Sequence, residues 1–430
     1  MKPRYRCCLL FMLCLSLMTN AQTAQKGAEA AQERPAIDWL KDIDYLATEL
    51  PKRHINLFAL KTPAYFQAGL EAIKQTCSHS DNLTVAVRLQ QLIASMGDSH
   101  TSVRYQAYLS PTSLLPLQMY WFKDGIHVIT TSNEHASLIG KRIMSVNGTP
   151  VEVVMDSLST LVTKDNDATV KSSIPSVLAA PSLLHILGFA EKDEVTFGLA
   201  DAQGQPSTVT LTPLLLNRQN TASHDPTKMP FCFRNQRSHF LDTLYQDDRL
   251  YYVQYNKCVS RESETQYGNP ANAASLPSFK EFESNVLQTL ATQPVRKLVF
   301  DMRFNSGGSS PQGTALIEKL ASFQRKHPHL AIYVVLGRRT FSSAILNAQD
   351  FKRLTKCTWI GEETSGKPNH FGEVRSFTLP SSGIVVNYST KYFRRSKEAL
   401  HSLVPDVVIE ADYQTFSQGI DPVLEWAIKQ

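Results

Sequence analysis

The sequence has 430 residues and an ordinary globular composition, with 42% hydrophobic and 19% charged residues. A chain of this length holds two or three domains with apolar cores. Its formal net charge is only +5, and its basic residues are scattered among Asp and Glu without a long Lys/Arg run. We therefore expect no nucleic-acid partner.

The first 21 residues have the three parts of a secretory signal peptide. Residues 1–6 carry three positive charges, residues 7–18 are apolar, and the segment ends in the small residue Ala21. Cleavage after Ala21 would export the protein to a periplasmic or extracellular location. The apolar stretch is shorter than the ~20 residues of a membrane span, and no later segment reaches that length. A retained N-terminal anchor is the alternative interpretation.

Four cysteines remain after removal of residues 1–21: Cys77, Cys232, Cys258 and Cys357. An even number in an oxidising compartment permits disulfides, in three pairings among which the sequence does not choose. Buried free thiols are an equal alternative. Because the sequence has no CxxC motif or His/Cys cluster, we expect neither a metal site nor a cofactor.

Helical patterns follow a leader rich in Ala, Gln and Glu at residues 22–35. Pro51 is expected to end the first helix, and Gly97 to cap the third. The patterns predict a helical N-terminal domain over residues 36–105. Apolar residues recur at helical spacing in three segments, residues 39–50, 65–73 and 85–96.

The next part of the chain, residues 106–215, consists of short β-rich runs. Asn147-Gly148 follows an apolar strand and is a strong turn signal. Residues 138–150 around it are similar to the strand-and-turn core of a PDZ domain, although Lys141 stands where an Asp is usual. An ordinary hairpin is the alternative. Further strands are predicted at residues 126–130, 194–199 and 207–211.

Buried strands alternate with helical patterns in residues 216–430, which predicts an α/β core domain. A hairpin is expected where residues 374–379 and 384–390 flank a turn. The predicted strands are residues 250–255, 298–302, 331–336 and 358–360, and the predicted helices are residues 279–290, 314–323 and 342–354.

Ser342 stands where the strand at residues 331–336 turns into a helix. The N–H groups of a helix N-terminus stabilise nearby negative charge, so this position suits an activated nucleophile. A helix N-cap is the alternative role for Ser342. The pair Gly307-Gly308 follows another buried strand, where a glycine turn can present backbone N–H groups to a ligand.

Six segments together resemble the C-terminal-processing (tail-specific) serine peptidases and their tricorn-core relatives. The resemblance covers roughly residues 36–430 and depends on motifs that occur in the family's order. They are "LVFDMRFNSGG" at residues 298–308, "TFSSA" at 340–344, "IGEETSGK" at 360–367, "MGDSHT" at 96–101, "VPDV" at 404–407 and "DPVLE" at 421–425.

The resemblance implies a crotonase-like ββα spiral peptidase core with an N-terminal helical domain and a PDZ-like β-rich domain. It assigns Ser342 as the nucleophile and the N–H of Ser343 and of Gly307 or Gly308 as oxyanion donors. Lys367 aligns with the family's lysine base, although a solvated lysine is the alternative. Two departures from the family leave the polar neighbours of Lys367 missing: Ile345 replaces a Glu, and Phe371 replaces a Gln.

Tricorn-core relatives use a histidine base, and Ser99-His100 resembles their Ser-His pair. Histidine titrates near neutral pH without special burial, which favours His100 over Lys367 as the base. A turn-stabilising role is the alternative for His100. Ser99, Glu373 and His370 are candidates for orienting the base: Ser99 is adjacent to His100, and the other two are close in sequence to Lys367.

These observations predict an exported serine-type endopeptidase that hydrolyses peptide bonds in peptides or unfolded proteins. The alternative is a catalytically weak or inactive member of the same fold that binds peptides or hydrophobic ligands. Lys141 and Arg142 in the PDZ-like segment could attract a substrate's C-terminal carboxylate, which would favour entry of substrates by that end.

Overall fold

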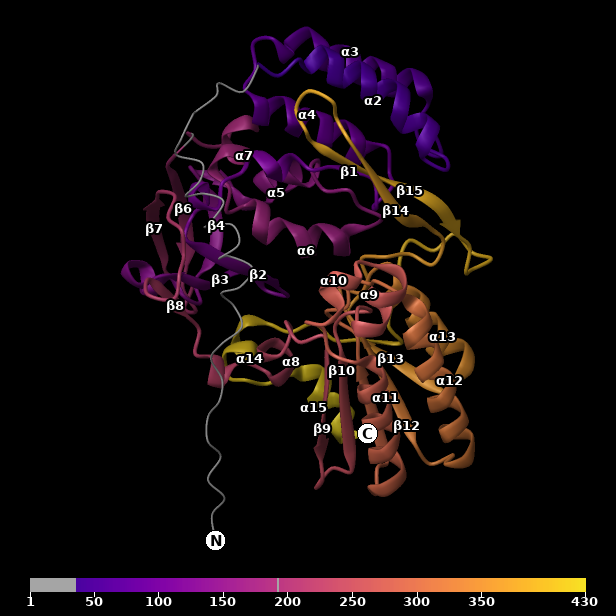
Figure 1. Cartoon of the computed structure of the whole chain (residues 1–430). Coiled ribbons are helices and arrows are strands. Elements are labelled where there is room, and N and C mark those ends of the chain that lie inside the picture. The colour runs from indigo at the N-terminus through magenta and orange to yellow at the C-terminus, as the bar shows by residue number, and fades with distance from the viewer. Residues whose placement is uncertain (1–35, 192) are drawn as a thin grey trace. The chain divides into compact units, whose positions relative to one another are not determined.

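A computed structural model describes residues 36–191 and 193–430, of which residues 39–430 form one compact unit (Figure 1). The predicted signal peptide and leader, residues 1–35, lie outside the described residues. No helix in the described ranges is both long enough and apolar enough to cross a membrane.

Three helices begin the described unit, as predicted. Asp81 caps the third, because its side chain accepts a hydrogen bond from the Thr84 N–H. The prediction that Pro51 ends the first helix was wrong: this helix continues to Arg53, because a proline in the last turn removes only one backbone donor. The helices are α2 (Trp39–Arg53), α3 (Pro63–Cys77) and α4 (Asn82–Ser95).

An antiparallel sheet follows, and its strands confirm the predicted β-rich texture. Asn147 and Gly148 both have positive φ, 46° and 80°, as a two-residue hairpin turn requires. The sheet has the order β2 (Leu117–Phe122), β3 (Gly125–Ser132), β4 (Arg142–Val146), β6 (Val195–Ala200) and β7 (Pro206–Leu211), with β5 (Thr149–Pro150) on β4 and β8 (Thr221–Ser223) on β3.

Three helices in this region were not predicted. Their apolar stripes are short, and the clearest local signal is Asn166, whose side chain accepts a hydrogen bond from the Thr169 N–H and caps α6. They are α5 (Val151–Ser159), α6 (Asp167–Val177) and α7 (Pro181–Ile186).

The C-terminal half is built on a second sheet, whose strands are parallel except for the antiparallel edge strand β9. All six residues of β10 are buried, as expected for a strand covered on both faces. The order is β16 (Val407–Val408), β13 (Cys357–Gly361), β12 (Ala331–Leu336), β11 (Lys297–Asp301), β10 (Leu250–Tyr255) and β9 (Phe240–Tyr245).

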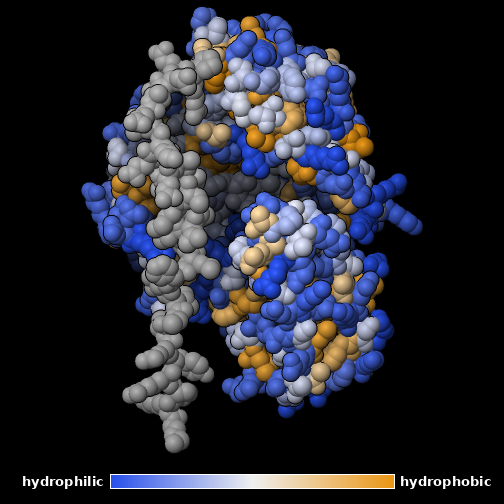
Figure 2. Space-filling view, in the orientation of Figure 1, coloured by the Kyte–Doolittle hydropathy of each residue, from blue (hydrophilic) through white to orange (hydrophobic). Residues whose placement is uncertain are grey.

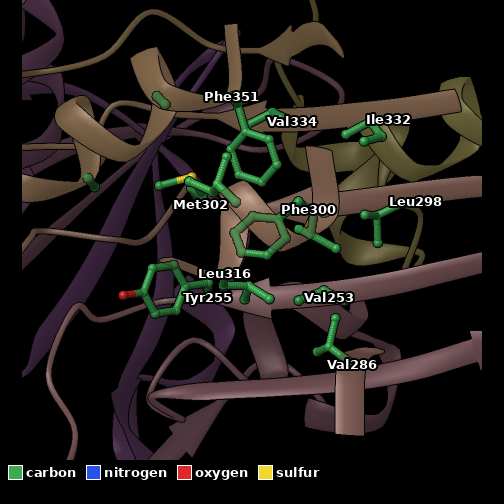
Figure 3. Close-up of a cluster of buried hydrophobic side chains, with 14 of the residues drawn as sticks. Val253, Tyr255, Val286, Leu298, Phe300, Met302, Leu316, Ile332, Val334 and Phe351 are labelled. Atoms are coloured by element: carbon green, nitrogen blue, oxygen red, sulfur yellow. The ribbon is translucent and has the colours of Figure 1, made fainter. Parts of the chain in front are cut away.

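Helices cover both faces of this sheet. On one face, Phe300 of β11 packs against Phe351 with ring centroids 4.8 Å apart (Figure 3). This face is covered by α11 (Phe279–Thr292), α12 (Ser310–Lys326) and α13 (Ser343–Leu354), and the other by α8 (Phe231–Arg234) and α15 (Pro422–Lys429). The other short helices are α9 (Arg261–Tyr267), α10 (Pro270–Ala273), α14 (Tyr413–Ser417) and 3-10 turns at Tyr105–Tyr108, Pro111–Ser113, Asn133–Leu138 and Pro226–Lys228.

A third, small sheet joins distant parts of the chain. The predicted hairpin forms β14 (His370–Thr378) and β15 (Val385–Phe393), and β15 also pairs with β1 (Ser102–Val103). The Ser389 hydroxyl donates to the Asp98 carboxylate over 2.6 Å. This pairing brings the loop that carries His100 to the C-terminal half of the chain.

The structure distinguishes between disulfides and free thiols for the four cysteines. Cys77, Cys232, Cys258 and Cys357 are all free thiols in the described structure, and the first three are buried. None of the three conceivable disulfide pairings forms among them.

Candidate active site

Ser342 occupies a sharp turn between β12 and α13. Its backbone has φ 52° and ψ −124°, a conformation that costs a residue with a side chain about 1–3 kcal/mol. Although Ser342 precedes the first helical residue, its side chain makes no capping hydrogen bond to α13. Strained backbone of this kind is concentrated at functional sites, so the geometry favours a nucleophile over an ordinary N-cap.

The glycine pair packs directly against this turn. Gly307 and Gly308 have φ of 103° and 132°, which only glycine adopts readily. A Cβ atom on Gly307 would lie 2.8 Å from the Ser342 Cβ, and one on Gly308 would lie 2.4 Å from the Cys258 carbonyl oxygen. Gly307 therefore permits the close approach of its loop to the Ser342 turn, and Gly308 permits the close approach to Cys258.

Buried Asn305 connects the two loops. Its side-chain Oδ1 accepts a hydrogen bond from the Gly307 N–H at 2.9 Å, and its carbonyl accepts one from the Phe341 N–H at 3.0 Å. The Ser343 hydroxyl adds a 2.6 Å hydrogen bond to the Gly308 carbonyl. The backbone on both sides of Ser342 is thus held in one arrangement.

Of the three predicted oxyanion donors, two are available. The Gly307 N–H is already bonded to Asn305, whereas the N–H groups of Gly308 and Ser343 have no acceptor in residues 36–191 and 193–430. The Ser343 N–H also belongs to the N-terminus of α13, whose dipole favours negative charge. The arrangement can accept a negatively charged oxygen beside Ser342.

His100 lies against Phe341, the residue that precedes Ser342. Its ring stacks on the Phe341 ring, with centroids 4.4 Å apart and planes inclined by 21°. The Nε2 atom is shielded from solvent and has no hydrogen-bond partner among the described residues. Burial lowers the pKa of His100 to about 4, so the imidazole is neutral at pH 7, the state that a general base requires.

The neighbours of His100 also select its tautomer. The Ser99 hydroxyl donates its only hydrogen to the Asp165 carboxylate at 2.7 Å, and Ser99 Oγ lies 3.4 Å from His100 Nδ1. Ser99 can therefore only accept from His100, which places the ring proton on Nδ1. The unprotonated Nε2 is then the atom that can take up a proton.

Asp98 fixes the loop that carries His100. Its buried carboxylate accepts hydrogen bonds from the His100 N–H, the Thr101 hydroxyl, the Ser389 hydroxyl and His54 Nε2, at 2.5–2.9 Å. Burial opposes ionisation of Asp98, but these hydrogen bonds outweigh it and hold its pKa well below the usual range. The carboxylate stays charged and anchors the loop.

Lys367 lies in an ion pair. Its Nζ is 2.8 Å from Asp165 Oδ1, and the Asp165 side chain is only 2% exposed. Lys367 is therefore held by a buried carboxylate, and within the described residues no hydrogen bond joins its Nζ to Ser342. The two positions where the family has polar groups are apolar in the structure as well: Ile345 is buried, and Phe371 packs on His54 with ring centroids 5.4 Å apart.

Asp165 was not singled out from the sequence. It lies in a polar loop before α6 with no local motif, and only the folded chain places it between Ser99 and Lys367. The sequence contains no periodic or spacing signal that marks it.

The two other candidate orienting residues, His370 and Glu373, have different surroundings. The His370 ring stacks with His100 at 5.6 Å, and its Nδ1 lies 2.9 Å from the Lys367 carbonyl oxygen. Burial lowers the pKa of His370 too. Glu373 lies on the exposed hairpin, where its carboxylate is 3.6 Å from Lys391 Nζ, and within the described chain no contact joins it to His100.

Two other groups near the site have less suitable chemistry. Burial raises the pKa of the Cys258 thiol to about 12, so this neighbour of the glycine pair is not a thiolate nucleophile. Cys232, Asp301 and Asp421 are close enough together to share a metal ion. However, the Arg303 guanidinium forms 2.8 Å ion pairs with both carboxylates and already supplies the positive charge there.

No protein-family model matches the sequence, and no curated protein sequence matches it. Solved structures do match. Mature CPAF complexed with lactacystin has 13% sequence identity and a TM-score of 0.62, over 91% of this chain and 96% of that chain. Mature CPAF alone has 12% identity and a TM-score of 0.58 over the same shares.

A photosystem II D1 C-terminal processing protease also matches, at 15% identity over 90% of this chain and 97% of that one, but its TM-score is only 0.39. At these identities the CPAF similarity shows a shared mixed α/β fold. The CPAF matches agree with the mixed α/β architecture that the sequence predicts.

Proposed function

We propose that the protein is a serine-type peptidase with Ser342 as nucleophile and His100 as general base. The observation that carries the proposal is the arrangement at the start of α13. A strained serine lies beside two backbone N–H donors that have no acceptor among the described residues, and a neutral imidazole stacks on the preceding phenylalanine.

In the proposed reaction, His100 Nε2 takes the proton of the Ser342 hydroxyl as Oγ attacks the peptide carbonyl carbon. The resulting oxyanion accepts hydrogen bonds from the Gly308 and Ser343 N–H groups. His100 then gives its proton to the leaving amine, and an acyl-enzyme ester remains. Water, deprotonated by His100, hydrolyses the ester and restores Ser342.

The remaining parts of the chain have roles consistent with this proposal. The antiparallel sheet of residues 106–215 would act as a PDZ-like domain, and residues 216–430 as a crotonase-like core, beside a helical domain of residues 36–105. The substrates would be peptides or unfolded proteins met after export. Lys367 and Asp165 would hold Ser99, and through it His100, rather than exchange protons with the substrate.

Labelling by a fluorophosphonate probe tests the nucleophile. The wild type should be labelled and Ser342→Ala should not, since only Ser342 is activated. Ser322→Ala is the matched control, because Ser322 is an exposed serine on α12 outside the candidate site, and this variant should still be labelled. Equal labelling of wild type and Ser342→Ala would remove Ser342 from its role. Lactacystin, which is bound to mature CPAF in a solved structure, is a second probe. Its addition before the fluorophosphonate should reduce labelling.

The apolar residues Ile345 and Phe371 favour a second candidate, a peptide-binding protein without turnover. Wild-type protein that binds unfolded peptides but cleaves none of them between about pH 5 and 9, where His100 is neutral, would support this alternative.

A further inference from the structure

Two neighbouring cavities lie beside the nucleophile turn. Their volumes are about 690 and 960 Å³, and both are lined by Ser172, Ser176 and Arg339. Arg339 is three residues before Ser342. On the face shown in Figure 2, hydrophobic residues form only small patches among hydrophilic ones.

The smaller cavity is strongly basic. Five cationic side chains line it, and no lining residue of either cavity is Asp or Glu. Two of the five are already neutralised: Arg338 lies 2.6 Å from Glu362, and Lys171 lies 3.3 Å from Glu410. The other three are Arg237, Lys257 and Arg339, and none of them has a carboxylate partner in the described part of the chain.

These three cations are connected to the loops of the candidate site. Lys257 precedes Cys258, whose N–H donates to the Gly307 carbonyl at 3.0 Å and whose carbonyl accepts from the Ser309 N–H at 2.7 Å. Arg339 Nη1 donates to Gln236 Oε1 at 3.3 Å, next to Arg237. The segments that carry Lys257 and Arg339 are therefore joined directly to the glycine pair and to Ser342.

The opposite wall offers backbone groups to an extended peptide. Residues 117–120 of the edge strand β2 line the same cavity, and an edge strand has unpaired N–H and C=O groups. A peptide that adds to this edge would carry its side chains past the three cations.

We propose that Arg237, Lys257 and Arg339 form a subsite for a carboxylate of the bound peptide, so that the protein selects acidic peptides. This inference rests on the proposed peptidase function. The carboxylate is that of an Asp or Glu side chain or of the peptide C-terminus, both of which arginine can bind with two parallel hydrogen bonds. Lys141 and Arg142 do not line this cavity. Lys141 Nζ donates to the Ser207 hydroxyl, and Arg142 donates to the Asp124 carbonyl.

The test uses four fluorescent unstructured peptides that differ only in one internal residue, Glu or Gln, and in a free or amidated C-terminus. Their binding to full-length Ser342→Ala protein is measured by fluorescence anisotropy, so that no cleavage interferes. In the pair that carries the recognised carboxylate, either Glu against Gln or free against amidated C-terminus, we expect the acidic peptide to bind about fivefold or more tightly than its neutral counterpart. The Glu/Gln pair and the free/amidated pair distinguish the two sources of carboxylate.

Added substitutions assign the effect to the subsite. Arg339→Gln or Lys257→Gln in the Ser342→Ala background should reduce the discrimination to less than about twofold. Lys280→Gln, which removes an exposed cation on α11 outside both cavities, should leave it unchanged. Equal affinity for all four peptides, no measurable binding, or discrimination that survives both subsite substitutions would overturn the proposal.

Failure of the subsite and failure of the peptidase proposal give different results. Labelling of wild-type Ser342 with equal peptide affinities refutes only the subsite. Discrimination between the peptides without labelling refutes only the catalytic role.

Discussion

The two sides of the candidate site are held in different ways. The core side, Asn305 to Gly308 and Thr340 to Ser343, is fixed by backbone geometry: positive φ angles, close glycine contacts and hydrogen bonds from Asn305. The other side, around His100, is fixed by side chains that come from four separate segments. They are His54, Asp98, Asp165 and Lys367.

This difference explains where the sequence departs from the family that it resembles. Backbone donors tolerate little change, because any side chain at Gly307 or Gly308 would collide with its neighbours. A network of side chains has more freedom, because its members come from separate segments. Of the two departures, Phe371 packs on His54, a member of this network, and Ile345 lies against Gly366, next to Lys367.

Removal of His100 should have the largest effect on the side-chain half of the site. His100→Ala removes the neutral imidazole that stacks on Phe341, so kcat should fall by about 10²-fold or more. Cleavage of an unstructured reporter peptide measures the effect, and circular dichroism checks the fold. Activity within a few-fold of wild type would assign the base elsewhere.

Gly308→Ala should have a comparable but smaller effect on the backbone half. The new Cβ would meet the Cys258 carbonyl oxygen at 2.4 Å, so the loop that presents the Gly308 N–H would have to shift. Loss of one oxyanion donor costs about 10²-fold in kcat. Gly383→Ala is a matched control, since Gly383 also has positive φ but nothing lies within 4 Å of its added Cβ. It should lose only stability.

The pH dependence of kcat/KM tests the role of His100, on the side-chain half of the site, without a substitution. Because burial lowers the pKa of His100 to about 4, kcat/KM should stay constant down to about pH 4 and fall below it, not near 6.5. The free energy of unfolding should also decrease as the pH falls. Below about pH 6.5 the unfolded chain binds a proton at His100 while the folded chain does not, so stability declines between about pH 6.5 and 4.

Kinetics and thermal unfolding measured over the same pH range check both expectations. An acid limb near pH 6.5 in kcat/KM would mean that His100 is not buried as described or is not the base.

The sequence predicts the local parts of this architecture better than the distant ones. The strands of the core and the helices α2, α3 and α4 have strong apolar periodicities, and Asn147-Gly148 specifies its hairpin chemically. The pairing of β1 with β15 joins residues more than 280 positions apart and has no local signal. For the same reason, the Ser342 turn and glycine pair could be identified from sequence, whereas Asp165 could not.

Lys367→Met should have the smallest effect on activity and the clearest effect on stability. It leaves the buried Asp165 carboxylate with Ser99 as its remaining side-chain donor, which should cost about 1–2 kcal/mol, since Lys367 is partly exposed. Asp165→Asn in the same chain should recover part of that loss, because the uncompensated charge is then gone. Urea unfolding measures both. If Lys367 only holds Ser99, kcat should stay within about tenfold of wild type. A loss of kcat as large as that of His100→Ala would instead indicate that Lys367, and not His100, is the general base.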